Sequence, residues 1–421
     1  MKILAALARL LCLTIVAETM VAGAPIDNRD WIAFRMSPTN NAVIEGENEV
    51  RWTTVTGASI SASPTLGGST LYIGNNGGNL NALDVRTGHV LWTRHLSNAL
   101  MSAPLLYHGL VIVGEGDEQS SGSAPNTLEY VGMGPSALVA LDAATGATRW
   151  RTVVAGSAMP TPTIVQGMLV EHNGAGWVMG IDPMTGHTRY TRGLHSIASM
   201  TAALPIGDDR FVTVGVLDNG VWQLRAATGA IVWRARFPAS GSGFGDCPPA
   251  TDGTRIFCNY VAPPGAEPYT AVGSPAVQRA YALDVRTGAK LWDVALQSGT
   301  LPPRNEAAIP LVAGGIVYFG SALAPYMHAV DASSGRVVWQ RHVRGPVKSG
   351  AVVLDGTLYF GDLAGYLWAL NAKTGSVVGV KKMPSGFNVG SPIAVGRTLV
   401  VGSRTGSVYA IPLAAITAAH D

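Results

Sequence analysis

The sequence predicts an all-β protein, an eight-bladed β-propeller made of four-stranded antiparallel blades. Two observations carry this prediction: a short motif recurs along the chain, and an incomplete strand set stands at each end of the repeat region. The motif reads A-[LIV]-D-x-x-T-G-x-x-x-W, with variations, and its first copy spans residues 82–92. Six further copies begin at residues 140, 180, 223, 282, 329 and 369, at intervals of 40 to 59 residues, and a period near 40 is typical of propeller blades.

The motif describes two strands joined by a tight turn. Apolar residues precede both the Asp and the Trp, and D-x-x-T-G lies between them. A carboxylate at the Asp position accepts backbone N–H bonds two residues on, and the Gly takes the positive φ that the turn needs. Because the Asp recurs in so many copies, we interpret it as part of the turn and not as a catalytic group; these residues are Asp84, Asp142, Asp182, Asp284 and Asp331. The Trp is interpreted as packing between blades.

The two ends of the repeat region complete each other. Residues 48–56 resemble the fourth strand of a blade with nothing before it, whereas residues 388–411 supply three strands without a fourth. Pairing them closes the ring and removes an exposed sheet edge. Seven motifs and this shared blade give eight blades, which begin near Ile60, Met101, Met159, Met200, Asp246, Asn305, Lys348 and Asn388. The propeller therefore spans residues 48–411, between an irregular leader (25–47), expected on the surface, and a tail (412–421).

The N-terminus predicts export. Residues 1–24 combine Lys2 and Arg9, an apolar run and a small-residue end, which is the layout of a secretory signal peptide. Leu11 precedes Cys12, so this cysteine does not resemble a lipid anchor. No later segment is apolar enough to span a membrane. We expect a periplasmic or secreted protein.

Cys247 and Cys258 fit an oxidising compartment. They flank a predicted hairpin that turns at Asp252-Gly253, and counting back from this two-residue turn places Thr251 opposite Thr254 and the cysteines opposite each other. A cross-strand disulfide is predicted.

Charge is scarce in this chain. Asp, Glu, Lys and Arg make up 13% of the residues, and the net charge is +2. This excludes the strong basic field that nucleic-acid binding requires. A surface with few carboxylates also suggests tolerance of acid.

The few charges gather where the inner strands begin, at the channel mouth. Two Gly- and Pro-rich loops, residues 116–136 and 261–277, lie on the same face, so recognition or catalysis is expected there. Asp246 and Glu306 are candidate general acids or bases, and Arg304 and Lys348 are candidate anion ligands, with Asn305 and Asn388 beside them. The alternative is that these charges are simply solvated.

Apolar residues line the rest of the mouth. Met101, Met159 and Met200 start three neighbouring blades; an apolar wall is favoured over a thioether site for a soft metal, and no metal is assigned. Five residues equivalent within their repeats are interpreted as core between blades: Trp222, Tyr281, His328, Trp368 and Tyr409.

The repeated motif resembles the tryptophan-docking repeat of the pyrroloquinoline-quinone (PQQ) type propellers over residues 48–411. That superfamily includes quinoprotein alcohol dehydrogenases, the outer-membrane assembly factor BamB, which has no cofactor, and tetrathionate hydrolases. Quinoprotein members carry adjacent cysteines above the quinone and Glu, Asn and Asp around calcium. This chain has no adjacent cysteines, and Glu306, Asn305 and Asp246 do not match the family's motifs, although their oxygens suit calcium. The cofactor stays unassigned, with PQQ and calcium as one option.

The resemblance implies a binding or scaffold protein at the cell envelope, as BamB is, with an envelope or secreted protein as its partner. The alternative is a periplasmic enzyme acting on a small anionic or alcohol ligand at the mouth. Such an enzyme is either a PQQ-dependent dehydrogenase or a tetrathionate-hydrolase-like enzyme with Asp246 as acid or base.

Overall fold

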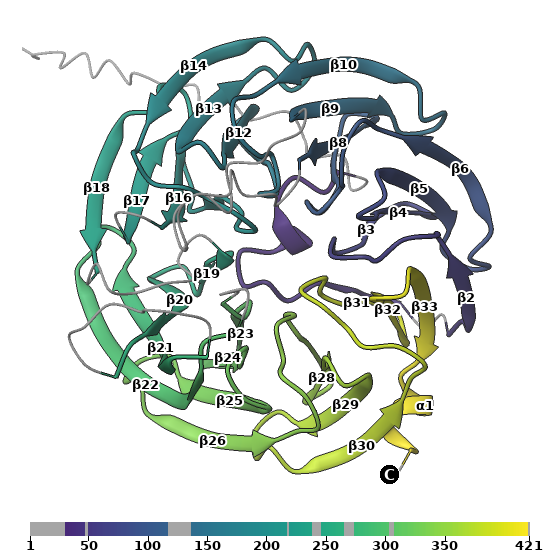
Figure 1. The fold of residues 1–421 in the computed structure, drawn as a ribbon, viewed down its shortest axis with the longest axis vertical. Coiled ribbons are helices and arrows are strands. Elements are labelled where there is room, and N and C mark those ends of the chain that lie inside the picture. The colour runs from purple at the N-terminus through teal and green to yellow at the C-terminus, as the bar shows by residue number, and fades with distance from the viewer. Residues whose placement is uncertain are drawn as a thin grey trace, which may run out of the picture.

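The fold is a ring of eight antiparallel sheets. The computed structural model describes residues 30–46, 49–116, 136–216, 219–237, 246–264, 273–302 and 307–419. Eight sheets are arranged around a central channel, and the chain passes through them in sequence order (Figure 1). The predicted all-β, eight-bladed propeller is confirmed.

Each blade runs from an inner strand at the channel to an outer strand at the rim. Blades 1 to 4 contain, in order, β3 (Thr65–Gly67), β4 (Thr70–Gly74), β5 (Asn79–Asp84) and β6 (Val90–His95); β7 (Leu105–Tyr107), β8 (Leu110–Glu115), β9 (Ala137–Asp142) and β10 (Thr148–Val153); β11 (Thr163–Val165), β12 (Met168–His172), β13 (Trp177–Ile181) and β14 (Thr188–Gly193); and β15 (Leu204–Pro205), β16 (Arg210–Gly215), β17 (Gly220–Arg225) and β18 (Ile231–Arg236).

The second half of the ring repeats this order. Blades 5 to 8 contain β19 (Ala250–Thr251), β20 (Arg255–Ala262), β21 (Pro275–Asp284) and β22 (Lys290–Thr300); β23 (Leu311–Ala313), β24 (Ile316–Gly320), β25 (Tyr326–Asp331) and β26 (Val337–His342); β27 (Val352–Leu354), β28 (Thr357–Gly361), β29 (Tyr366–Asn371) and β30 (Val377–Lys382); and β31 (Ile393–Val395), β32 (Thr398–Gly402), β33 (Ser407–Pro412) and β2 (Trp52–Val55).

Strands from both ends of the propeller close the ring. β2 pairs antiparallel with β33, with Trp52 opposite Ala410, and the two strands lie side by side in Figure 1. β1 (Val43–Ile44) adds a fifth strand to the same sheet by pairing parallel with β31. The predicted closure by residues 48–56 is confirmed, and the additional inner strand was not foreseen.

The recurrent Asp serves the turn, as predicted. Asp84 Oδ1 accepts hydrogen bonds from the backbone N–H groups of Arg86 (3.1 Å) and Thr87 (2.9 Å) and from the Thr87 hydroxyl (2.8 Å). The same bonds to backbone N–H groups recur at Asp142, Asp182, Asp284 and Asp331.

The aromatic residue that ends the motif packs on the turn of the next blade. The Trp339 indole N–H donates to the Ala372 carbonyl oxygen (3.0 Å), and its ring covers Gly375. Gly375 has a φ of +68°, and a Cβ atom there would lie 2.6 Å from the ring, so both the turn and the docked ring require glycine. Equivalent contacts link blade to blade from Trp52 onward.

One copy of the motif has Gly379 where the others have an aromatic ring. The short helix α1 (Ala414–Thr417) occupies that space, because a Cβ atom on Gly379 would collide with the carbonyl group of Ile416. The end of the chain thus replaces the missing ring, outside β30 (Figure 1).

The aromatic residues expected between blades are buried. Trp222, Tyr281, His328, Trp368 and Tyr409 are each at most 6% exposed. In the described part of the chain no helix is long and apolar enough to cross a membrane.

The leader is the main correction to the sequence prediction. Residues 30–46 do not lie on the surface but fill the centre of the ring, with the one-turn helix η1 (Phe34–Met36) in the channel (Figure 1). Trp31 pairs with Leu106 in blade 2, and Asn41 exchanges hydrogen bonds with Val353 in blade 7. We call residues 30–46 the plug. Its backbone polar groups bond to inner strands, whose inward edges would otherwise be unpaired.

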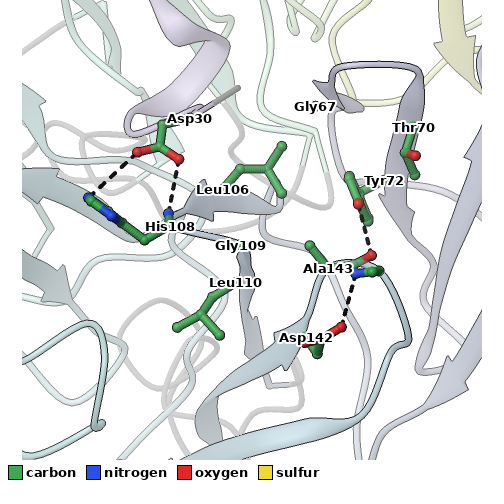
Figure 2. Close-up of a pocket in the computed structure, with 11 residues that line it drawn as sticks. Asp30, Gly67, Thr70, Tyr72, Leu106, His108, Gly109, Leu110, Asp142 and Ala143 are labelled. Carbon is green, nitrogen blue, oxygen red and sulfur yellow. Dashed lines mark hydrogen bonds and ion pairs between the residues drawn. The ribbon is translucent and has the colours of Figure 1, made fainter. Parts of the chain in front are cut away.

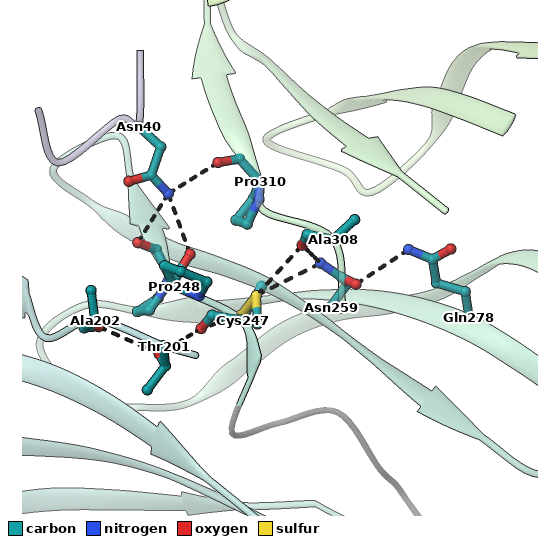
Figure 3. The surroundings of a disulfide bond; sticks show 11 residues. Asn40, Thr201, Ala202, Cys247, Pro248, Asn259, Gln278, Ala308 and Pro310 are labelled. Atoms are coloured by element: carbon teal, nitrogen blue, oxygen red, sulfur yellow. Dashed lines mark hydrogen bonds between the residues drawn. A yellow bond between two sulfur atoms is a disulfide. The ribbon is translucent and has the colours of Figure 1, made fainter. Parts of the chain in front are cut away.

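The cysteine hairpin turns later than predicted. Thr251 lies opposite Ile256, not Thr254, so four residues form the turn, and Cys247 precedes the strand. The predicted disulfide between Cys247 and Cys258 is present, with Cα atoms 6.3 Å apart (Figure 3). It joins the start of the inner strand to β20 in one blade.

Candidate functional site

The channel mouth is built by equivalent residues that precede each inner strand. Strand register places a Pro directly before six of the eight inner strands: Pro64, Pro104, Pro162, Pro249, Pro310 and Pro392. The residue three positions before it faces the channel, as Ser61, Met101 and Asp246 do.

This register also places two residues that were not candidates. In blades 6 and 8 the described residues that line the channel are Ala307 and Val389. Asn388 is half-buried, one residue before the channel wall, and its amide lies 3.5 Å from the Ser61 hydroxyl. Alignment on the shared prolines, a signal already in the sequence, would have found both wall residues.

The plug closes the channel beneath the mouth. The Phe34 side chain packs among Ala103, Ala202 and Ile309, which belong to blades 2, 4 and 6. The cavity left between Phe34 and the described mouth residues has a volume of about 20 Å³, enough for one water molecule or ion. Nothing in the sequence pattern indicated that residues 30–46 form the channel floor.

Asp246 and two methionines line this cavity. Asp246 is 4% exposed, and Met101 and Met200 also line the cavity. The next residue, Cys247, is held by the disulfide and by the Thr201 hydroxyl, which donates to its carbonyl oxygen (2.9 Å; Figure 3). Asp246 is thus fixed from blades 4 and 5 at the entrance to the channel.

Of the four other predicted site residues, the structure describes one. Arg304, Asn305 and Glu306 lie outside the described residues. Lys348 occupies the channel-facing position of blade 7 and is half-buried. Their roles stay predictions.

The cationic group at the channel floor comes from the plug. Arg35 is 1% exposed, and its Nη2 donates to the carbonyl oxygens of Ala351 (2.7 Å) and Pro392 (2.9 Å). Its Nε and Nη1 have no hydrogen-bond partner. Burial lowers the pKa of Arg35 to about 9.

Two hollows open on the face opposite the mouth, where the D-x-x-T-G turns lie. The first, about 630 Å³, lies between blades 1 and 2; the Tyr72 hydroxyl on its floor donates to the Ala143 carbonyl oxygen (2.9 Å; Figure 2). Asp30 of the plug and His108 meet at its edge (3.9 Å; Figure 2). We call it groove 1. Such space was not predicted on this face.

Groove 2, about 560 Å³, is the equivalent hollow between blades 6 and 7. The Tyr318 hydroxyl donates to the Ala372 carbonyl oxygen (3.1 Å) on its floor. Arg336 and Lys373 line it together with Asp331, whereas Asp30, His108 and Asp142 line groove 1. The two grooves share a shape and differ in charge.

A family model described as outer membrane protein assembly factor BamB matches residues 41–128, 120–201 and 276–415. The chain belongs to this family. The matched segments include both groove-forming blade pairs and the plug's C-terminal strand β1.

Individual relatives of this BamB-family chain divide between two functions. BamB of Yersinia pestis is 24% identical, over 96% of this chain and 99% of its own length. Tetrathionate hydrolase of Acidithiobacillus ferrooxidans is 27% identical, over 80% of this chain and 69% of its own. The structure of a europium-containing methanol dehydrogenase superposes with a TM-score of 0.66 at 16% identity, over 90% and 91% of the two chains, and shows the shared fold.

PQQ, the cofactor that this fold suggests, does not fit the described mouth. A cavity of about 20 Å³ is far below the hundreds of Å³ that an organic cofactor occupies. The cysteines that form the disulfide are eleven residues apart, not adjacent. Among the described residues no three His, Cys, Asp or Glu side chains gather as metal ligands. We derive no chemistry through the quinone.

Proposed function

We propose that this BamB-family propeller is an exported binding protein that acts as a scaffold at the cell envelope, in the periplasm. The observation that carries the proposal is the filled channel: the plug leaves about 20 Å³ where a ligand of a propeller commonly lies, whereas each groove offers more than 500 Å³ on the opposite face. The match to BamB over 96% and 99% of the two chains supports the same reading. The partner is a protein of the envelope.

Complementation tests this proposal. The chain, given the host's own export signal, should restore outer-membrane protein levels in a strain that lacks BamB. Groove substitutions should reduce this activity: Ala144→Glu in groove 1 and Lys373→Glu in groove 2. Ala227 and Arg286 stand at the same turn positions in blades 4 and 5 and line neither groove, so Ala227→Glu and Arg286→Glu are matched controls. Failure of the unmodified, exported chain to complement would contradict the scaffold role.

A hydrolase acting on a tetrathionate-like anion is the second candidate. One observation favours it: Asp246 is a buried carboxyl that lines the small cavity at the channel mouth, an environment typical of catalytic acids and bases. Purified protein would then consume tetrathionate, and Asp246→Asn would abolish turnover while Asp252→Asn, in the exposed hairpin turn of the same blade, would not. No consumption at neutral or acidic pH would reject this candidate.

A further inference from the structure

Groove 2 is lined by two cationic side chains that form no ion pair with any other residue the structure describes. They are Arg336, in the turn of blade 6, and Lys373, in the turn of blade 7, and both are exposed. In blade 2, by contrast, the turn arginine Arg149 is already paired with Asp142 (2.7 Å). The positive charges of groove 2 are therefore available to a ligand.

The turn of blade 7 lacks the carboxylate that the motif carries in five other blades. Asn371 stands at the Asp position and lines groove 2, whereas Asp142 stands at the equivalent place in groove 1. Asn371 Oδ1 accepts hydrogen bonds from the N–H groups of Lys373 (3.0 Å) and Thr374 (3.0 Å), so the turn is kept. The change from Asp to Asn thus removes a negative charge from the groove without altering the turn.

The two carboxylates nearest to these cations in the turns serve other partners. Asp331 Oδ1 accepts hydrogen bonds from the hydroxyl groups of Ser333 (2.6 Å) and Ser334 (2.8 Å) in its own turn. Asp355, next to the lining residue Gly356, pairs with Arg397. Among the described lining residues, groove 2 holds two cations and one carboxylate, whereas groove 1 holds two carboxylates and no Lys or Arg.

Apolar side chains form the walls between the two cations. Four half-buried residues line the groove: Ala313, Ile316, Val338 and Val353. The Tyr318 ring lies on the floor, and its hydroxyl group is already bonded to a backbone carbonyl oxygen. Covering these apolar atoms removes them from water, which favours binding of an apolar side chain. The volume of about 560 Å³ is typical of a ligand site and far larger than a simple ion requires.

We propose that groove 2 binds an extended peptide segment of a partner protein, in which acidic residues flank one or two apolar residues. The acidic side chains pair with Arg336 and Lys373, and the apolar side chains pack on Val338 and Val353. The identification of the ligand as a protein segment rests on the proposed scaffold function. The preference for acidic and apolar side chains rests on the groove itself.

The test is isothermal titration calorimetry of the purified protein with the capped peptide acetyl-Glu-Asp-Leu-Val-Asp-Glu-amide. Two control peptides separate the contributions: acetyl-Gln-Asn-Leu-Val-Asn-Gln-amide has no charge, and acetyl-Glu-Asp-Gly-Ser-Asp-Glu-amide has no apolar side chain. The first peptide should bind with a stoichiometry of one and about fivefold or more tightly than either control. Added salt should weaken its binding, because the charges are exposed and screened.

Charge reversal assigns the binding to groove 2. Arg336→Glu and Lys373→Glu should each weaken binding of the acidic peptide about fivefold or more, because an attraction becomes a repulsion. Arg286→Glu makes the same change of charge at the equivalent turn of blade 5, outside both grooves, and should leave the affinity unchanged. Unchanged thermal unfolding of the three variants verifies that each is folded.

Two results would overturn the proposal: equal affinity for the acidic and the uncharged peptide, or an equal loss of affinity in Arg286→Glu. Binding of short-chain polyphosphate as tight as that of the acidic peptide would also overturn it, since the groove would then select charge alone. Complementation keeps this inference distinct from the scaffold role. A chain that complements but does not bind the peptide loses only this inference, and a chain that binds the peptide at groove 2 but does not complement loses only the scaffold role.

Discussion

At the residue scale, Glu171 departs most clearly from its repeat. The equivalent positions in other blades hold apolar side chains such as Ile73 and Phe360, which face the preceding blade. Glu171 is 1% exposed, and neither carboxyl oxygen has a hydrogen-bond partner. Burial raises the pKa of Glu171 well above its ordinary value, because the charged form is poorly solvated there.

We expect Glu171→Gln to stabilise the protein at neutral pH. The folded state holds the Glu171 proton to a higher pH than the unfolded state does, so its contribution to stability is complete below the unfolded pKa and declines as the pH rises above it. Each unit of the pKa shift is worth about 1.4 kcal/mol. Thermal unfolding should show the two proteins alike near pH 4 and the variant more stable at pH 7.

Glu115 supplies the matched control, since it is equally buried but partnered. Its carboxylate binds Arg151 and accepts a hydrogen bond from the Ser97 N–H (2.8 Å). Glu115→Gln should therefore lower stability at pH 7. If Glu171→Gln also destabilised the protein at pH 7, the result would show that the Glu171 carboxyl group has a partner.

Asp142 shows the opposite pH dependence. Hydrogen bonds from Arg149 and Thr145 lower the pKa of Asp142 to about 2. A lowered folded pKa gives stability that is present above the unfolded pKa and lost as the pH falls through the folded value. We expect Asp142→Ala to cost about 1 kcal/mol at pH 7, from the lost turn hydrogen bonds, and less near pH 2. Denaturant unfolding at both pH values measures this. A difference in unfolding free energy that does not change with pH would contradict this prediction.

At the element scale, the contact between one blade's aromatic ring and the next blade's turn links the sheets. Gly375 and Gly356 lie in the same blade with similar φ values, +68° and +73°, but only Gly375 has a ring against it. A Cβ atom at Gly356 would meet nothing within 4 Å. Comparing alanine substitutions at these two glycines therefore separates the cost of backbone strain from the cost of displacing the ring.

We expect Gly375→Ala to destabilise the protein more than Gly356→Ala. Both substitutions carry the cost of alanine in the left-handed region, about 1–2 kcal/mol. Only Gly375→Ala also pushes Trp339 from its turn, which adds about 1–3 kcal/mol of overpacking. Chemical unfolding with Trp fluorescence measures both. Equal losses of unfolding free energy in the two variants would show that the Trp339 ring moves aside without cost.

At the scale of the whole molecule, the plug organises the channel. The Asn40 side-chain amide donates to the carbonyl oxygen of Pro310 in blade 6 (3.0 Å). The same amide lies near the carbonyl groups of Pro248 and Pro249 in blade 5. Arg35 bonds to the residues before two further inner strands. A segment of 17 residues, 30–46, thus contacts most of the ring from inside.

We expect Phe34→Ala to destabilise the entire propeller by about 3–5 kcal/mol, because it leaves a void where three blades meet. Met36, in the same turn but 49% exposed, is the control, and Met36→Ala should change stability by less than about 0.5 kcal/mol. Differential scanning calorimetry should show a single lowered transition for Phe34→Ala. Unchanged stability would mean that the plug is not part of the cooperative unit.

The sequence alone determined the repeat, the blade count, the turn role of Asp84 and its equivalents, the closure by β2 and the disulfide. These features depend on local hydrogen bonds or on patterns that recur in every blade, so each copy of the motif supports the interpretation of the other copies. The residues that face the channel could not be identified in this way. Which residue faces the axis depends on strand register, and the sequence pattern did not single out Ala307 or Val389, which line the channel.

The tertiary structure alone decided the place of the plug and which mouth residues share the small cavity beside Phe34. Phe34 and Arg35 belong to no repeat, so no second copy indicated that they are buried. Met101, Met200 and Asp246 come together because ring closure brings three blades to one axis, although the residues are up to 145 positions apart in the chain. Their convergence is a property of the ring, since no local interaction along the chain holds them together.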